Sequence, residues 1–141
     1  MNSDERRLMD KTCTHRAEFT LLDEHGGARP ITVDMAYRAS DPFAVELTLT
    51  LQRLRPVKWL VARSLLTEGM LEPAGAGDFR LQPLSRGIIS VELLPPNGHA
   101  LLHARAEDLL LFLAKTYALV RPGSEQVDID ELIINLVNSQ Q

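Results

Sequence analysis

Hydrophobic and polar residues alternate along much of the chain between residues 13 and 104, as they do in half-buried β-strands. The clearest alternation lies within residues 43–52, where every second residue is apolar: Phe43, Val45, Leu47, Leu49 and Leu51. The same pattern predicts strands near 13–21, 31–37, 57–61, 79–81, 89–93 and 100–104. We therefore expect about seven short, mostly antiparallel strands in a twisted sheet or barrel-like core.

Three segments carry helical patterns instead. Residues 62–69 contain good helix formers and end at Gly69, which predicts a short helix with this glycine near its C-cap. Residues 106–120 are apolar around most of a helix, with a stripe of Leu109, Leu110, Leu113 and Tyr117. A last helix begins near Asp128, and its apolar face contains Ile129, Leu132, Ile133, Leu136 and Val137. The fold class is therefore α+β, with one mid-chain helix and two C-terminal helices.

The remaining segments complete one domain. A length of 141 residues suits a single core, which we place at residues 13–141. Residues 1–12 are polar and without periodicity, so we expect a flexible tail. Residues 73–78 are rich in glycine and alanine and predict a loop, while Trp59 should anchor sheet to helix.

Composition and charge narrow the class of protein. The net charge of -4 gives no overall positive field, so nucleic-acid binding is not favoured. Cys13 is the single cysteine and has no partner for an internal disulfide. No apolar run is long enough for a signal-peptide core or a membrane span. We expect a cytoplasmic protein that reaches a membrane only through partners.

No set of residues predicts catalysis, a cofactor or a metal. The four histidines are scattered, and folding would have to bring His15 and His103 together before they could act as a pair. The carboxylates at 128–131 suit the first turn of a helix, where the dipole favours them. Cys13 could be a nucleophile, but a buried strand cysteine is the commoner case. We therefore interpret the chain as a protein without enzymatic activity.

Two groups of residues are candidates for an interaction surface. Arg53, Arg55, Lys58 and Arg63 could line one basic surface, either as solvated strand-end charges or as phosphate contacts. The apolar stripe of the last helix, represented by Leu132 and Leu136, could cover a partner or a second copy. The alternative is that the helix packs between the sheet and the neighbouring helix of the same chain, which would give the same apolar stripe.

The order of several motifs resembles the SsgA-like family of sporulation and cell division regulators. An aspartate-proline turn at 41–42 precedes a tryptophan-containing strand at 57–61 and an arginine-leucine-leucine helix at 63–69. Further segments that look like the family are 73–81, 95–102 and 119–125. The resemblance covers the chain from about Cys13 to the C-terminus and leans towards the SsgB branch.

This resemblance implies a function and an assembly. It implies a regulator of sporulation-specific septation that marks septum sites and recruits the tubulin-like division GTPase FtsZ, with an SsgA-type protein as a second partner. It also implies a Whirly-like fold, a homotrimer and a location at division septa. The alternative is a single-stranded nucleic-acid-binding protein, since Whirly-type proteins bind single strands.

Overall fold

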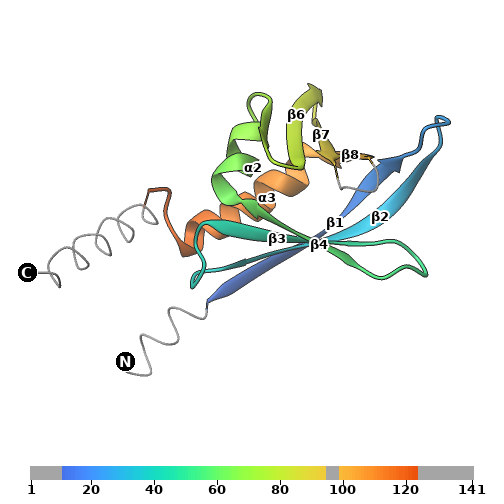
Figure 1. Ribbon diagram of the computed structural model, residues 1–141. Coiled ribbons are helices and arrows are strands. Elements are labelled where there is room, and N and C mark those ends of the chain that lie inside the picture. Colours follow the sequence, from blue (N-terminus) through green and yellow to red (C-terminus); the bar gives the residue numbers. More distant parts are fainter. Residues whose placement is uncertain (1–10, 95–98, 124–141) are drawn as a thin grey trace, which may run out of the picture.

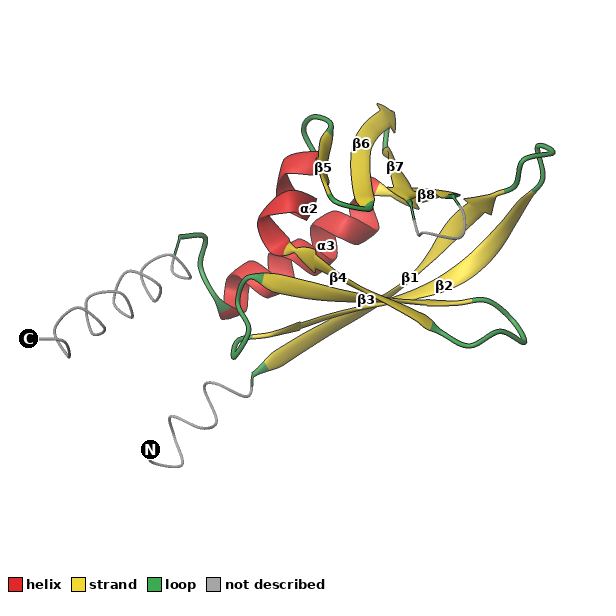
Figure 2. Ribbon diagram, viewed as in Figure 1, coloured by secondary structure: helices red, strands yellow, loops and turns green. Residues whose placement is uncertain are grey.

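A computed structural model describes residues 11–94 and 99–123 of the chain. One antiparallel sheet of eight strands carries two helices on the same side, and the sheet curls around them (Figures 1 and 2). The first half contains β1 (Thr12–Leu22), β2 (Ala28–Arg38), β3 (Ala44–Thr50), β4 (Val57–Ala62) and helix α2 (Arg63–Gly69). The second half contains β5 (Ala74–Ala76), β6 (Phe79–Ser85), β7 (Ile88–Leu93), β8 (Ala100–Arg105) and helix α3 (Ala106–Leu119). The predicted α+β class is confirmed.

Each half is a four-stranded meander followed by a helix. The strand order across the sheet is β4-β3-β2-β1-β8-β7-β6-β5, so the two meanders meet where β1 pairs with β8. That ladder contains three residue pairs, from Thr20 with His103 to Leu22 with Leu101. β1 and β2, by contrast, pair over eleven residues. The junction between the halves is therefore much shorter than the ladders within them.

The core lies between the helices and the inner face of the curled sheet. Alternate residues of the strands point into it, including Val33 and Met35, which are both fully buried. The rings of Trp59 on β4 and Phe79 on β6 lie 6.2 Å apart at an angle of 52°. Trp59 was expected between sheet and helix, but this contact joins the two halves of the sheet across the core.

Several local predictions were wrong. The sheet has eight strands instead of about seven, because Ala74–Ala76 pairs with β6 although its alanines and glycine show no alternation. Phe43 is 39% exposed because β3 begins one residue later. On α3 the predicted Leu109 and Leu113 are buried, but Leu110 is 55% exposed and the buried face includes Thr116 instead. Residues 1–10 and the predicted last helix at 128–137 lie outside the described residues.

Gly69 is required by close packing rather than by an unusual backbone angle. It is buried within α2, where the helix approaches Leu81 of β6. A Cβ atom on this glycine would lie 2.1 Å from Cγ of Leu81, far inside van der Waals contact. The short helix therefore rests on the sheet through a position that accepts no side chain.

Substitution Gly69→Ala tests this packing. In a helix that does not touch the sheet, glycine to alanine would stabilise by about 1 kcal/mol. Here we expect destabilisation by about 1–3 kcal/mol, because Leu81 must move. Urea unfolding measures the change, and Ser64→Ala on the exposed side of the same helix is the control. An increase in stability for Gly69→Ala would contradict the described packing.

Candidate interaction surface

Arg63, the first residue of α2, is a buried cation with 2% of its surface exposed. Its Nη1 donates hydrogen bonds to the carbonyl oxygens of Thr116, at 3.2 Å, and Val120, at 2.7 Å. The guanidinium carbon lies 4.2 Å from the ring centre of Tyr117 and 5.0 Å from that of Tyr37. The carbonyl end of a helix and the faces of aromatic rings both favour a cation. Arg63 therefore links α2, α3 and β2 inside the core.

This location corrects the interpretation of Arg63 as part of a basic surface. Residues three positions apart share a face of a helix, and Leu66 is 1% exposed. Arg63 consequently lies on the core face of α2. Its spacing from Leu66 was the signal in the sequence that could have shown this.

Two tyrosine hydroxyl groups extend the same junction. Tyr37 donates from its hydroxyl to the carbonyl oxygen of Pro42, at 3.0 Å. The hydroxyl of Tyr117 is hydrogen-bonded to Oγ1 of Thr67 on α2. The aspartate-proline turn is thus held to the buried cation through Tyr37, which gives this motif a structural role.

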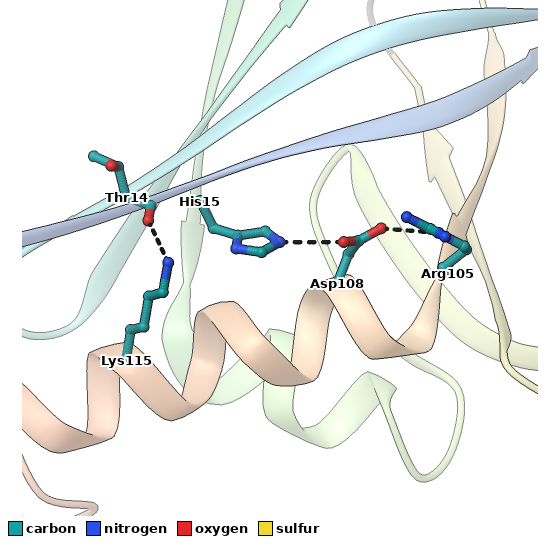
Figure 3. A network of polar contacts seen from close by, with 5 residues as sticks. All are labelled: Thr14, His15, Arg105, Asp108 and Lys115. Atoms are coloured by element: carbon teal, nitrogen blue, oxygen red, sulfur yellow. Dashed lines mark hydrogen bonds and ion pairs between the residues drawn. The ribbon is translucent and has the colours of Figure 1, made fainter.

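A polar network ties α3 to the part of β1 that lies beyond its ladder with β8 in the described chain (Figure 3). Lys115 of α3 donates from Nζ to the carbonyl oxygen of Thr14, at 3.0 Å. Nε2 of His15 lies 3.1 Å from Oδ1 of Asp108, and Nε of Arg105 donates to Oδ2 at 3.2 Å. α3 therefore supplies polar contacts along the part of β1 that β8 does not reach.

The chemistry of this network is that of a structural link. Asp108 is 7% exposed in the first turn of α3, where the helix dipole favours a carboxylate. Cys13 lies on the same side of β1 as His15, and burial raises the pKa of its thiol, although the charges of Lys115 and Arg63 act in the opposite direction. A thiol with a raised pKa is a weak nucleophile near neutral pH.

His15 and His103 lie on opposite faces of the sheet. His15 contacts Asp108 on the helix side, whereas the neighbours of His103 on β8, Leu102 and Ala104, are the residues that are buried. The two histidines therefore do not form a pair. Within residues 11–94 and 99–123, no three histidine, cysteine, aspartate or glutamate side chains are grouped so that they could hold a metal ion.

On the outer face of the sheet, away from the helices, cations are paired with carboxylates of neighbouring strands. The pairs are Arg16 with Asp34 at 2.7 Å, Lys58 with Glu46 at 2.7 Å, and Arg80 with Glu92 at 3.9 Å. Exposed pairs of this kind add little stability, but they cancel local charge. This face therefore has alternating charges rather than a positive stripe.

Two of the larger hollows lie on the described part of the sheet. One has a volume of about 470 Å³, and its lining includes Gly75, Arg80, Gln82, Ser90 and Glu92. The other, of about 430 Å³, lies beside the β1–β8 junction and is lined by Glu18, Thr20, Ile88, His103, Ala104 and Arg105. Each is lined by one carboxylate and one arginine, so neither hollow has the excess of positive charge that favours phosphate groups.

The predicted interaction residues have different surroundings. Arg53 and Arg55 are exposed in the β3–β4 loop, and Arg53 has a positive φ of 68°, which is unusual for a residue with a side chain. Lys58 lies on β4 and is paired with Glu46. Leu132 and Leu136 lie outside the described residues. None of the helices that the structure describes is long and apolar enough to cross a membrane.

Comparison with known sequences gives a consistent set of relatives. Residues 31–125 match the family described as "Streptomyces sporulation and cell division protein, SsgA". The sporulation-specific cell division protein SsgB of Saccharopolyspora erythraea is 35% identical over 89% of this chain and 92% of its own length. SsgB of Streptomyces coelicolor is 33% identical over 92% of this chain and 98% of its own.

Two solved structures have the same fold. The SsgA-like sporulation-specific cell division protein of Thermobifida fusca superposes with a TM-score of 0.79 at 31% identity, covering 96% of this chain and 98% of that one. The second gives a TM-score of 0.78 at 35% identity, covering 84% of this chain and 95% of that one. It is described by the words "Mutations in SsgB correlate to longitudinal cell division during sporulation of Streptomyces coelicolor".

The buried guanidinium predicts a large cost for a conservative substitution. Arg63→Lys keeps the charge but loses the planar group that reaches two carbonyl oxygens and two rings. We expect a loss of about 1–3 kcal/mol in the free energy of unfolding, measured in urea. Arg55→Lys in the exposed loop is the matched control and should change stability by less than about 0.5 kcal/mol. Equal effects of the two substitutions would contradict the structural role of Arg63.

Proposed function

The chain belongs to the SsgA-like family, in its SsgB branch, and from this membership we propose that it is a non-enzymatic regulator of sporulation-specific cell division. In this proposal it marks septum sites and recruits FtsZ or promotes its assembly. The observation that carries the proposal is similarity over nearly the whole length of relatives named as sporulation-specific cell division proteins. The sequence similarity covers the whole domain, and it supports a shared role more strongly than a shared fold alone would.

Action by binding rather than by catalysis is supported by the use of the polar residues. Arg63 is bonded to the end of α3, and the pair of His15 and Asp108 joins β1 to the same helix. These three residues are among the buried or half-buried groups of the described chain that could otherwise serve in an active site. Because these residues hold the fold together, they favour a protein that acts through contacts at its surface.

The proposal includes partners and a location. An SsgA-type protein would be a second partner beside FtsZ, and the protein would act in the cytoplasm at division septa. Contact with the membrane would be indirect, through those partners. Each of these points rests on family membership.

Single-strand nucleic-acid binding is the weaker alternative. Two meanders, each followed by a helix, support the Whirly-like architecture that the family resemblance implies. The carboxylates paired with Arg16, Lys58 and Arg80 on the open face of the sheet weigh against a phosphate-binding surface.

Co-sedimentation with FtsZ tests direct recruitment. With GTP, the purified chain is expected to pellet with FtsZ polymers and to change their assembly or bundling, measured by light scattering. With GDP in place of GTP, FtsZ does not polymerise and the chain should stay in the supernatant. If the chain neither pellets with polymers nor alters their assembly, direct recruitment is wrong.

We also propose a homotrimer, which the exposed apolar residues of the single chain support. Leu71 is 83% exposed, Leu110 55% and Leu111 49%, and burial of such side chains favours association. Leu110 and Leu111 are adjacent on α3, on the side turned away from the core.

Sedimentation equilibrium at micromolar concentration is expected to give three times the chain mass of 15.7 kDa. Replacing both Leu110 and Leu111 by glutamate should shift the species towards the monomer, because charge would be buried at the contact. The comparison variant is Leu84→Glu, a single leucine-to-glutamate substitution at an exposed position of β6. A monodisperse monomer of the unmodified chain would overturn the trimer.

A further inference from the structure

β4 leaves one edge of the sheet unpaired among the described residues. It is the terminal strand of the sheet and forms a ladder with β3 alone. Its other neighbour in the chain, α2, covers the inner face and not this edge (Figure 2). The opposite terminal strand, β5, has only three residues. Proteins commonly shorten edge strands to prevent unwanted pairing, and here one edge is short while the other is not.

The hydrogen-bonding groups on the open side of β4 follow from its register. The backbone N–H of Arg63 donates to the carbonyl oxygen of Phe43 at 2.7 Å, so the residues that bond to β3 are 57, 59, 61 and 63. The N–H and C=O groups of Lys58, Leu60 and Ala62 therefore point away from β3. Because Ala62 is the N-cap of α2, its C=O accepts the first hydrogen bond of that helix, so the edge offers three donors and two acceptors at the spacing of a β-ladder.

The side chains around this edge combine apolar and basic groups. Leu54, Val57 and Leu60 are 64%, 54% and 70% exposed. Arg53 and Arg55 lie in the loop that leads into the strand, and this loop projects away from the helices (Figure 1). Lys58 on this strand is paired with Glu46 on β3.

We propose that the outer edge of β4 binds an extended segment of a partner protein by strand addition, and that this segment alternates apolar residues with acidic ones. Its backbone would pair with the N–H and C=O groups of Lys58 and Leu60 and with the N–H of Ala62. Its apolar side chains would lie beside Leu60 on the outer face of the sheet, and its carboxylates would face Arg53 and Arg55. This inference deepens the proposed function, on which it rests for the existence of a protein partner, by naming the surface and the chemistry of the partner segment.

A synthetic peptide of about ten residues that alternates valine with glutamate is the first probe, with a lysine-for-glutamate peptide as its counterpart. Trp59, the single tryptophan, lies on β4 and reports binding by its fluorescence. We expect saturable binding of the acidic peptide and none of the basic peptide. Absence of a response to the acidic peptide at millimolar concentration would overturn the proposal.

Substitution Leu60→Pro tests the backbone contribution. It removes an N–H that points away from β3, so the β3–β4 ladder keeps its hydrogen bonds, and proline is tolerated at such edge positions. Affinity for the acidic peptide should fall at least about tenfold, while Leu60→Thr, which keeps the N–H, should lose less. Circular dichroism establishes whether each variant is folded. A folded Leu60→Pro variant that binds as well as the unmodified chain would overturn strand addition.

Reversal of the loop charges does not depend on the folding of the proline variant. The double variant Arg53→Glu with Arg55→Glu should bind the acidic peptide about tenfold more weakly than the unmodified chain. It should also gain binding of the basic peptide. Arg86→Glu, in the exposed β6–β7 turn at the other end of the sheet, should change neither. Unchanged peptide preference in the double variant would contradict the charge complementarity.

Two further measurements identify other occupants of the edge. If Leu60→Pro abolishes self-association, a second copy of the chain covers the edge. If a single-stranded oligonucleotide binds at low salt and this binding is lost in the Arg53→Glu with Arg55→Glu variant, the loop binds nucleic acid. Either result overturns the proposal. FtsZ co-sedimentation of the unmodified chain is scored separately. If the chain binds the acidic peptide but does not co-sediment with FtsZ, the proposed function is rejected and the β4 site is retained.

Discussion

The rest of the structure depends on one buried cation. Arg63 is removed from water, which costs free energy unless its donors and charge are satisfied. The carbonyl oxygen of Val120, just beyond α3, needs a donor because the last turn of a helix supplies none, and that of Thr116 accepts from Arg63 as well as from the N–H of Val120. Tyr37 and Tyr117 offer ring faces on two other elements. The guanidinium therefore gains acceptors and the end of α3 gains a donor. This contact holds the first meander against the second.

The sequence predicted the parts of the structure that follow from periodicity. Alternation located the strands of both meanders, and loss of alternation located α2 and α3 to within a residue or two. The failures have physical causes. β5 is held by pairing of small residues that carry no pattern, and the rotation of α3 depends on which side meets β1. Gly69 was assigned to a helix cap, whereas contact with Leu81, distant in the sequence, decides its role.

The candidate site was less accessible from the sequence, because charge alone does not reveal burial or pairing. Four basic residues near one another in the chain have three different surroundings: Arg63 is in the core, Lys58 is paired, and Arg53 and Arg55 are exposed in a loop. The open edge of β4 consists of backbone groups, which every residue possesses. Only the strand order shows which of these groups lack a partner strand within the described part of the chain.

The short junction between β1 and β8 has a consequence for how the chain folds. Most strand pairs join neighbours along the chain, so each meander can form through local contacts with a small loss of chain entropy. The three-pair junction joins strands from opposite ends of the domain and gains little until α3 lies along β1. We therefore expect the two meanders to form as separate local units, and their union at the β1–β8 junction to be the slower, long-range step.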